Sequence, residues 1–326
     1  MSVERTRPNL DVAIDVEPAF GPAEWPIAAG LPQLPGTLAD GTRTAEASAS
    51  VWRRHLAPTA REGFSDIELP TTWVSPSDLT GERQNELFGV IADLGLNAIG
   101  ISVARSSVIH PTLGEASMEL HYRTIDVAAA RGIGFVCTGF HEPLTSAQQQ
   151  ALWFWDETRQ ERRPSDEEFD VAAARIRELG AHAESVGVEL ALEMYENTVL
   201  GSADDALRLL EMIDCPAVGL NPDIGNLIRL NREVEHWERM LAVTLPHANY
   251  WHVKNYSRGT IESGVAYATA PVEMKAGLID YRTALRYAVA HGFSGPLVVE
   301  HYGGDGIAMS ADNRDYLRRI LPVGRD

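Results

Sequence analysis

The sequence has few groups that could cross-link the chain or anchor it in a bilayer. Only two cysteines, Cys137 and Cys215, occur among 326 residues, and they form neither a disulfide framework nor a CxxC motif. We interpret them as buried free thiols and expect a cytoplasmic protein, because free thiols persist in reducing compartments. No apolar run approaches the roughly 20 residues needed to span a bilayer. The N-terminus is polar and rich in proline, without the continuous apolar core of a signal peptide.

Positive charge is also scarce. The chain has 28 Lys and Arg against 46 Asp and Glu, which gives a formal net charge of −18. This surplus argues against nucleic acid or an anionic membrane as a partner, because both would repel the protein. Most of the acidic residues lie in segments that we expect to be solvated helices, although a metal site would also contribute to the total.

The chain does contain short apolar runs that alternate with segments of helical spacing. The runs are bounded by Gly, Pro or Asn, as strands usually are. Alternating strands and helices predict a parallel sheet, and eight such units predict a single-domain (β/α)8 TIM barrel. The expected strands cover residues 27–34, 65–70, 96–103, 133–139, 188–193, 218–223, 250–254 and 296–300. Among the expected helices are those over about residues 44–62, 233–245 and 310–321, and Ser202 should cap the helix that follows it.

Three segments fall outside this repeat. Residues 1–24 have no periodicity and predict an irregular arm, which covers either the barrel of residues 25–326 or a neighbouring subunit. Residues 144–166 and 257–276 are long insertions, and loops of this length are usually functional. The first insertion contains Trp153, Phe154 and Trp155, which cannot all face one way. They either line a cleft or an interface, or they cap the barrel core. The second is polar and lacks clear periodicity.

Four acidic or imidazole side chains occur at the ends of four successive runs. They are Glu193, Asp223, His252 and Glu300. In a parallel barrel the C-terminal ends of the strands meet at one face, so these side chains should converge. Three carboxylates repel one another unless a cation lies among them. Hard oxygen ligands and one nitrogen suit Mn²⁺ first, with Mg²⁺ or Co²⁺ as alternatives.

Other polar residues should lie at the same face. His141 follows the fourth strand, and it is either a functional group or a loop histidine that packs beside Phe140. Glu196 lies three residues after Glu193, so that one of the two could bind metal and the other could meet substrate. The glycine-rich turn 301–306 could cradle an anion, although such turns are common.

Four motifs resemble a known family. The segments LEMYEN, NPDIGN, WHVKNY and VVEHYGGD are similar to metal-site segments of xylose isomerase-like TIM-barrel proteins, the sugar phosphate isomerase/epimerase group. The resemblance covers about residues 27–322 and is sharpest over 188–306. It implies that Glu193, Asp223, His252 and Glu300 are metal ligands and that Glu193 and Glu300 move a proton beside a sugar carbonyl. Candidate donors to the sugar are Arg105, Asn226 and Lys254.

One position departs from the epimerases, which commonly have a histidine three residues after the metal aspartate, where this chain has Asn226. The WHVKNY and EHYGGDG turns, the His141 loop and the aromatic insertion resemble the larger subunit of bacterial C-glycoside deglycosidases. That resemblance implies a lyase in which His141 takes the C2 proton of a 3-oxo-C-glucoside. It also implies a small β-rich second subunit, and we expect an oligomer.

Three other functions remain open at this point. A ketose or sugar-phosphate isomerase or epimerase is the main alternative, because it uses the same metal-assisted proton removal. A DNA-repair endonuclease is disfavoured by the charge of −18 and by the lack of the extra histidines that a trinuclear zinc site needs. A non-catalytic sugar-binding barrel would leave the acidic cluster without a use.

Overall fold

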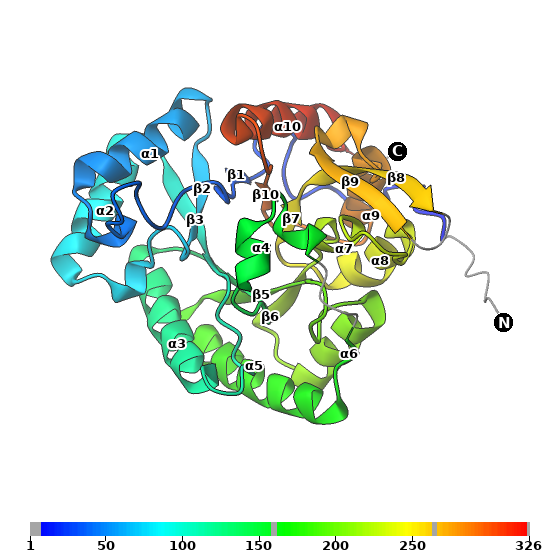
Figure 1. Ribbon diagram of the computed structural model, residues 1–326. Coiled ribbons are helices and arrows are strands. Elements are labelled where there is room, and N and C mark those ends of the chain that lie inside the picture. The colour runs from blue at the N-terminus through cyan, green and yellow to red at the C-terminus, as the bar shows by residue number, and fades with distance from the viewer. Residues whose placement is uncertain (1–7, 158–161, 263–265, 325–326) are drawn as a thin grey trace.

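The computed structural model describes residues 8–157, 162–262 and 266–324 and contains the predicted barrel (Figure 1). Eight parallel strands form one sheet in the order β6-β5-β4-β3-β2-β1-β10-β7. A parallel bridge between Leu220 and Ala248 brings β6 next to the chain that leads into β7, so the sheet nearly closes. The strands are β1 Ile27–Ala29, β2 Asp66–Pro70, β3 Asn97–Val103, β4 Phe135–Thr138, β5 Glu189–Glu193, β6 Val218–Asn221, β7 Trp251–Val253 and β10 Leu297–Val299.

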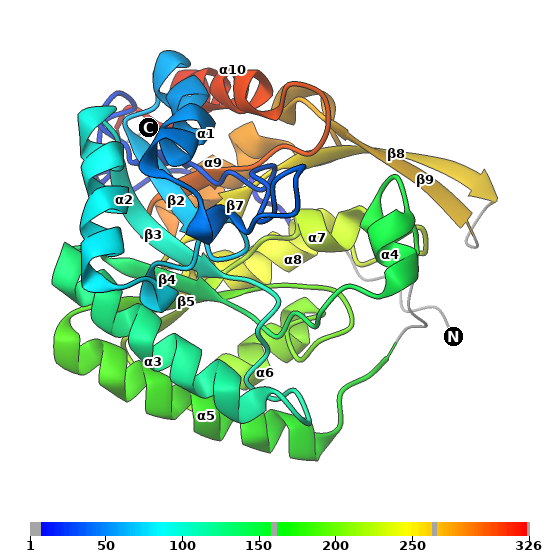
Figure 2. The same ribbon diagram turned by 60° about the vertical axis from the view of Figure 1, so that its left-hand side comes forward.

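Helices surround the strands and bury their apolar faces against them (Figures 1 and 2). Their ends follow the capping residues in the sequence. Ser165 and Glu168 form a capping box at the start of α5, and Ser202 accepts a hydrogen bond from the amide of Asp205 at the start of α6, as predicted. The ring consists of α1 Ala49–Arg61, α2 Gly81–Asp93, α3 Gly114–Arg131, α5 Asp166–Val186, α6 Ala203–Ile213, α8 Trp237–Thr244, α9 Tyr281–Ala290 and α10 Gly306–Ile320.

Several boundaries differ from the sequence prediction. The helix expected over 44–62 is divided into a short 3₁₀ turn, Thr44–Glu46, and α1, because Ala47 and Ser48 adopt extended conformations between them. The last helix begins at Gly306 rather than Ser310, since the side chain of Asp305 caps it by accepting from the amide of Ala308. The helix expected to begin at Glu233 begins at Trp237.

The sequence of the second insertion, residues 257–276, suggested an irregular segment, but the structure shows regular strands there. The insertion forms an antiparallel hairpin of β8 Asn255–Glu262 and β9 Ala266–Val272, which projects from the barrel (Figure 2). Most of its side chains are exposed or half-buried, which explains why no apolar period marks it. Arg258 fixes the hairpin to the barrel by donating to the carbonyl oxygens of Ile228, Leu230 and Arg232. Ile228 is the last residue of the short helix α7, Gly225–Ile228, and the other two residues follow it.

The first insertion folds over the barrel with a short helix, α4 Ser146–Gln150, and a 3₁₀ turn, Phe154–Asp156. Its three aromatic residues diverge as expected. Trp155 is buried and stacks on Trp153 with ring centroids 5.0 Å apart, whereas Phe154 packs edge-on against Tyr302. The insertion therefore packs on the turn after β10 and forms part of the wall of the cavity described below.

The described part of the N-terminal arm, residues 8–24, lies on its own barrel. Leu10 and Ile14 are buried, and Arg286 of α9 donates to the carbonyl oxygen of Val12. Arg318 of α10 donates to the carbonyl oxygens of Pro22 and Ala23. Covering the barrel is therefore the alternative that these contacts support.

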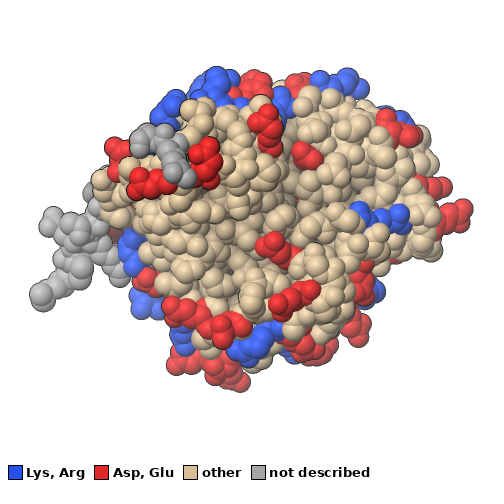
Figure 3. Space-filling view, turned by 180° about the vertical axis from the view of Figure 1, so that it is seen from behind, with Lys and Arg blue, Asp and Glu red and all other residues tan. Residues whose placement is uncertain are grey.

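The prediction of buried free thiols is correct for Cys137 but only in part for Cys215. Cys137 is buried inside the barrel, Cys215 is half-buried, and both are free. Within the described ranges, no helix has both the length and the apolar character needed to cross a membrane. On the face seen in Figure 3, charged side chains lie mainly around the rim, and uncharged residues fill the centre.

Candidate active site

The structure brings the four predicted metal ligands together at the C-terminal ends of neighbouring strands. Glu193 ends β5, Asp223 follows β6, His252 lies in β7 and Glu300 follows β10. His252 Nδ1 lies 3.8 Å from Glu193 Oε1, 3.7 Å from Asp223 Oδ2 and 3.7 Å from Glu300 Oε1. All four side chains are buried, so their charges are poorly screened by water.

These residues fit a divalent cation. Donor atoms that share one ion through bonds of about 2.0–2.6 Å lie about 3–4 Å apart, as these do. His252 Nδ1 and Asp223 Oδ1 are buried and have no hydrogen-bond partner among the residues that the structure describes. Such atoms are costly unless something binds them, and a cation would. One imidazole nitrogen and three carboxylates form a hard donor set.

Lys254 and Asn226, predicted to contact substrate, both contact the carboxylates of this cluster, and Asn226 also lines the cavity described below. Lys254 Nζ donates to Asp223 Oδ2 at 2.5 Å and to Glu300 Oε2. Burial opposes the charge of Lys254, but the carboxylates outweigh burial and hold its pKa well above the usual value. Asn226 Nδ2 lies 2.9 Å from Glu193 Oε1 and 3.1 Å from Asp223 Oδ2, so it orients both groups.

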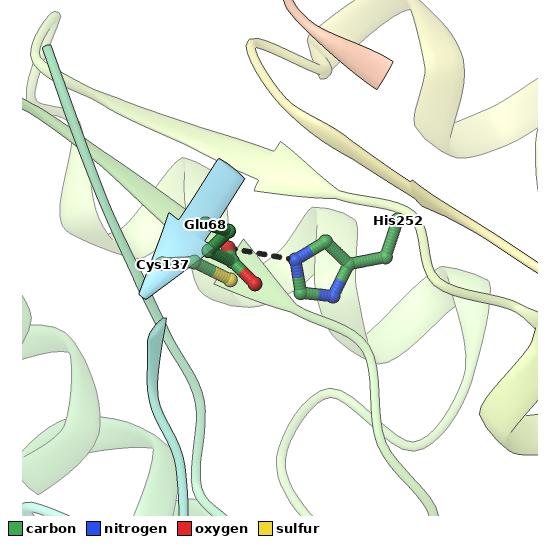
Figure 4. Close-up of side chains that lie close together, drawn as sticks. All are labelled: Glu68, Cys137 and His252. Atoms are coloured by element: carbon green, nitrogen blue, oxygen red, sulfur yellow. Dashed lines mark hydrogen bonds and ion pairs between the residues drawn. The ribbon is translucent and has the colours of Figure 1, made fainter. Parts of the chain in front are cut away.

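The other ring nitrogen of His252 faces a residue that the sequence analysis missed. Glu68, in the middle of β2, shares a hydrogen bond with His252 Nε2 at 2.9 Å between Oε1 and Nε2, and Cys137 lies beside it (Figure 4). The sequence signal was weak, because Glu68 alternates with Ile67 and Leu69 as the polar residues of a half-exposed strand do. Burial raises the pKa of the Cys137 thiol to about 12, so the thiol is neutral near pH 7. A neutral thiol is a poor ligand for a hard cation, so such a cation should bind at Nδ1 of His252, on the side of the carboxylates.

His141 lies beside the cluster, on the loop after β4. Its Nε2 is 3.5 Å from Glu193 Oε2, and its ring packs edge-on against Tyr195 with centroids 4.2 Å apart. Burial lowers the pKa of His141 to about 4, although Glu193 opposes this shift. The imidazole is therefore neutral near pH 7. Its contacts with Glu193 and Tyr195 distinguish it from a histidine that only packs on Phe140.

A cavity of about 290 Å³ opens over these groups. Its size is close to the lower limit for small-molecule sites. His141, Glu193 and Glu300 form its polar side, while Leu144, Phe154 and Tyr302 contribute an apolar and aromatic wall. The site thus combines a buried acidic cluster and a neutral imidazole with room for a small organic substrate.

Comparison with known proteins decides the family. The model of the xylose isomerase-like TIM barrel family matches residues 56–320. The chain belongs to the xylose isomerase-like TIM barrel family. A crystal structure of such a protein from Mycobacterium smegmatis in complex with magnesium is 39% identical, with a TM-score of 0.87, over 93% of this chain and 98% of that one.

Two curated relatives of this xylose isomerase-like barrel are more distant. A ketose 3-epimerase of Arthrobacter globiformis is 22% identical over 281 residues, which cover 84% of this chain and 83% of the epimerase. A 3-oxo-isoapionate decarboxylase of Pectobacterium atrosepticum is 27% identical over 112 residues, which are 34% of this chain. The matched part spans only 38% of the decarboxylase.

Arg105, the remaining predicted donor of this xylose isomerase-like barrel, lines the cavity. Its guanidinium donates to Tyr195 Oη at 2.7 Å and to the carbonyl oxygen of Glu142 at 3.2 Å. Its backbone has a φ of 61°, an uncommon conformation for a residue with a side chain. Strained backbone of this kind is concentrated at functional sites, which supports a role for Arg105.

Glu196 does not face the cluster and pairs with an arginine that the sequence analysis missed. Arg229 Nη2 lies 3.1 Å from Glu196 Oε2, and Arg229 is fully buried. The guanidinium carbon lies 4.8 Å from the ring centroid of Phe154 and 5.0 Å from that of Trp155. Glu196 and Arg229 therefore anchor the aromatic wall of the cavity.

Proposed function

We propose that the protein is a divalent-metal-dependent enzyme that removes a proton from the carbon next to a sugar carbonyl. The observation that carries this proposal is the position of His141 beside the four-ligand cluster, at one cavity. The ketose 3-epimerase relative and the magnesium-bound member of the family add support. We propose Mn²⁺ as the ion, with Mg²⁺ or Co²⁺ as alternatives.

The proposed chemistry follows from the acidity of the substrate. A C–H bond next to a carbonyl is acidic only when negative charge on the carbonyl oxygen is stabilised, and a bound divalent ion supplies that stabilisation as a Lewis acid. Glu193, Asp223, His252 and Glu300 would hold the ion. His141 Nε2 would accept the proton, and Arg105 would donate hydrogen bonds to substrate oxygens.

The specific reaction that we propose is β-elimination from a 3-oxo-C-glucoside. The C2–H and C1–aglycone bonds break, a C1=C2 double bond forms and the aglycone takes up a proton. The aromatic wall around Phe154 and Tyr302 suits a flat aglycone. Asn226 also bonds to two cluster carboxylates at the position where epimerases commonly have histidine. A small β-rich second subunit and an oligomeric assembly belong to this proposal.

The competing function is a ketose or sugar-phosphate isomerase or epimerase. Similarity to a ketose 3-epimerase along 84% of the chain favours it. The same cluster and the same proton removal serve both reactions, so the site geometry alone does not choose between them.

One experiment in heavy water separates the two. After elemental analysis of the purified protein, it is incubated with a panel of free ketoses and with a panel of 3-oxo-C-glucosides. Lyase action releases aglycone from the oxidised glycosides only. Epimerase action places deuterium on the carbon next to the carbonyl of a free ketose. Full turnover of either substrate after exhaustive chelation would contradict the metal-dependent mechanism itself.

A further inference from the structure

We infer that Glu68 is a positioning residue for the metal-binding histidine. Its carboxylate holds His252 with the proton on Nε2 and the lone pair of Nδ1 turned toward the cluster carboxylates. This inference rests on the proposed metal site, and it adds a residue that no motif of the family suggested.

Glu68 is at an unfavourable place for a charge. It is 1% exposed in the barrel interior, and its neighbours in β2, Ile67 and Leu69, are apolar and fully buried. The cost of desolvating a buried carboxylate often exceeds the stability that its pairing returns. Its hydrogen bond to His252 Nε2 at 2.9 Å therefore indicates an effect on that ring.

The hydrogen bond selects one tautomer. A neutral imidazole donates from one nitrogen and accepts at the other. An ionised Glu68 carboxylate can only accept a hydrogen bond, so in the neutral ring beside it the proton belongs on Nε2 and the lone pair remains on Nδ1. Figure 4 shows the bond from Glu68 to one ring nitrogen, with the other nitrogen on the far side of the ring. That nitrogen lies 3.7–3.8 Å from three carboxylate oxygens. A carboxylate on the outer nitrogen also makes imidazole a better ligand.

The cluster of Glu68, Cys137 and His252 allows a different interpretation, a soft-metal site on the opposite side of the ring. The hydrogen bonds around the thiol argue against it. Asn221 Nδ2 donates to Cys137 Sγ at 3.3 Å, and Asn221 Oδ1 accepts from the backbone amide of His252 at 2.7 Å. Asn221 thus ties the thiol and the histidine backbone together without any ion.

The test compares Glu68→Gln with Cys137→Ala, a control at the other contact of the same ring. Mn²⁺ affinity is measured by calorimetry on the stripped full-length chain, and the tautomer of His252 is read from the imidazole ¹⁵N shifts. We expect Glu68→Gln to weaken Mn²⁺ binding by about 10–100-fold and to populate the Nδ1-protonated tautomer. Cys137→Ala should change neither quantity.

Three results would overturn the inference. Unchanged Mn²⁺ affinity in a folded Glu68→Gln variant would leave Glu68 a structural residue. Loss of binding in Cys137→Ala, with thiolate charge-transfer absorption from Co²⁺ in the wild type, would place the ion on the thiol side. A neutral His252 ring with its proton on Nδ1 rather than Nε2 in the wild type would overturn the inference even if the variants do not fold. If the wild type binds no divalent ion, the proposed function fails instead, and the ¹⁵N shifts still decide the tautomer.

Discussion

Lys254 Nζ lies 2.5 Å from Asp223 Oδ2, the same oxygen that faces His252 Nδ1 at 3.7 Å. The ammonium therefore neutralises part of the acidic cluster in which we place the ion. It should hold the carboxylates in place and should also repel a second cation. The first effect raises the stability of the metal-free protein, and the second lowers its affinity for the metal ion.

Lys254→Met should separate the two effects. We expect the stripped variant to lose about 3–5 kcal/mol of unfolding free energy, because buried carboxylates lose their partner. The variant should bind the ion more tightly than wild type, so the stabilisation on adding metal should grow. Urea unfolding with and without Mn²⁺ measures both. Lys275→Met removes an exposed lysine paired with Glu273 and serves as the control. Weaker metal binding in Lys254→Met would contradict this account.

Removal of the ion from the wild type should lower both stability and activity. Ligand binding to the folded state alone adds about 2.7 kcal/mol when the free ion is at about 100 times its Kd. We expect the melting temperature to fall after chelation and to recover when Mn²⁺ is restored. Turnover should fall and return together with it. A melting temperature that does not respond to chelation would argue that the cluster binds no ion.

His141→Ala should keep the ion and lose turnover. His141 does not belong to the four-ligand set, whereas Glu193, 3.5 Å from it, does. Loss of a general base typically costs about 10²–10⁴-fold in rate. Glu193→Gln should lose both metal affinity and activity, and the exposed His247→Ala should lose neither. Metal content and kcat, measured on the same samples, distinguish the three variants. Near-full activity in His141→Ala would reject this base.

Acid should destabilise the protein through His121, which does not belong to the four-residue cluster. Its ring is buried between the carbonyl oxygen of Ser117 and the hydroxyl of Thr138, each 2.6 Å away, and burial lowers its pKa from 6.5 to about 4. The unfolded chain binds a proton below pH 6.5 and the folded chain does not. Stability is therefore complete above pH 6.5 and falls as the pH drops toward 4.

The loss through His121 should reach about 3 kcal/mol at the lower end of that window. His121→Gln removes the titrating group, so the variant should lose correspondingly less stability on acidification. Urea unfolding of both proteins across the pH range gives the difference. Parallel pH profiles for wild type and variant would show that the imidazole is already protonated in the folded protein, or that it titrates normally.

The strand ends and the convergence of the four acidic and imidazole side chains could be predicted because each side chain follows a local feature of the sequence. Asp223 and Glu300 follow apolar runs directly, and parallel strands place such ends at one face. Glu68 and Arg229 could not be predicted in this way. A single glutamate inside a strand, or an arginine after a short helix, gains its meaning only from partners far along the chain. The partner of Glu68 is His252, 184 residues away.

The hairpin was missed for a related reason. Periodicity in sequence reflects burial against a core, and most of β8 and β9 is not buried. Lys254 and Asn226 lay at the predicted face, but sequence position does not reveal which acceptor a side chain reaches. Both side chains contact the cluster carboxylates, and these contacts depend on how the folded backbone places the strand ends relative to one another.

The hairpin of β8 and β9 extends away from the barrel, yet residues of the hairpin form hydrogen bonds with the loop that carries Arg229. Arg258 donates to carbonyl groups on both sides of that arginine, and the Thr269 hydroxyl donates to the carbonyl oxygen of Arg229 itself. Any force applied to the outer strands is therefore transmitted to the loop beneath the aromatic rings. A protein that docked on the hairpin would therefore act on Arg229 and, through it, on the aromatic wall of the cavity.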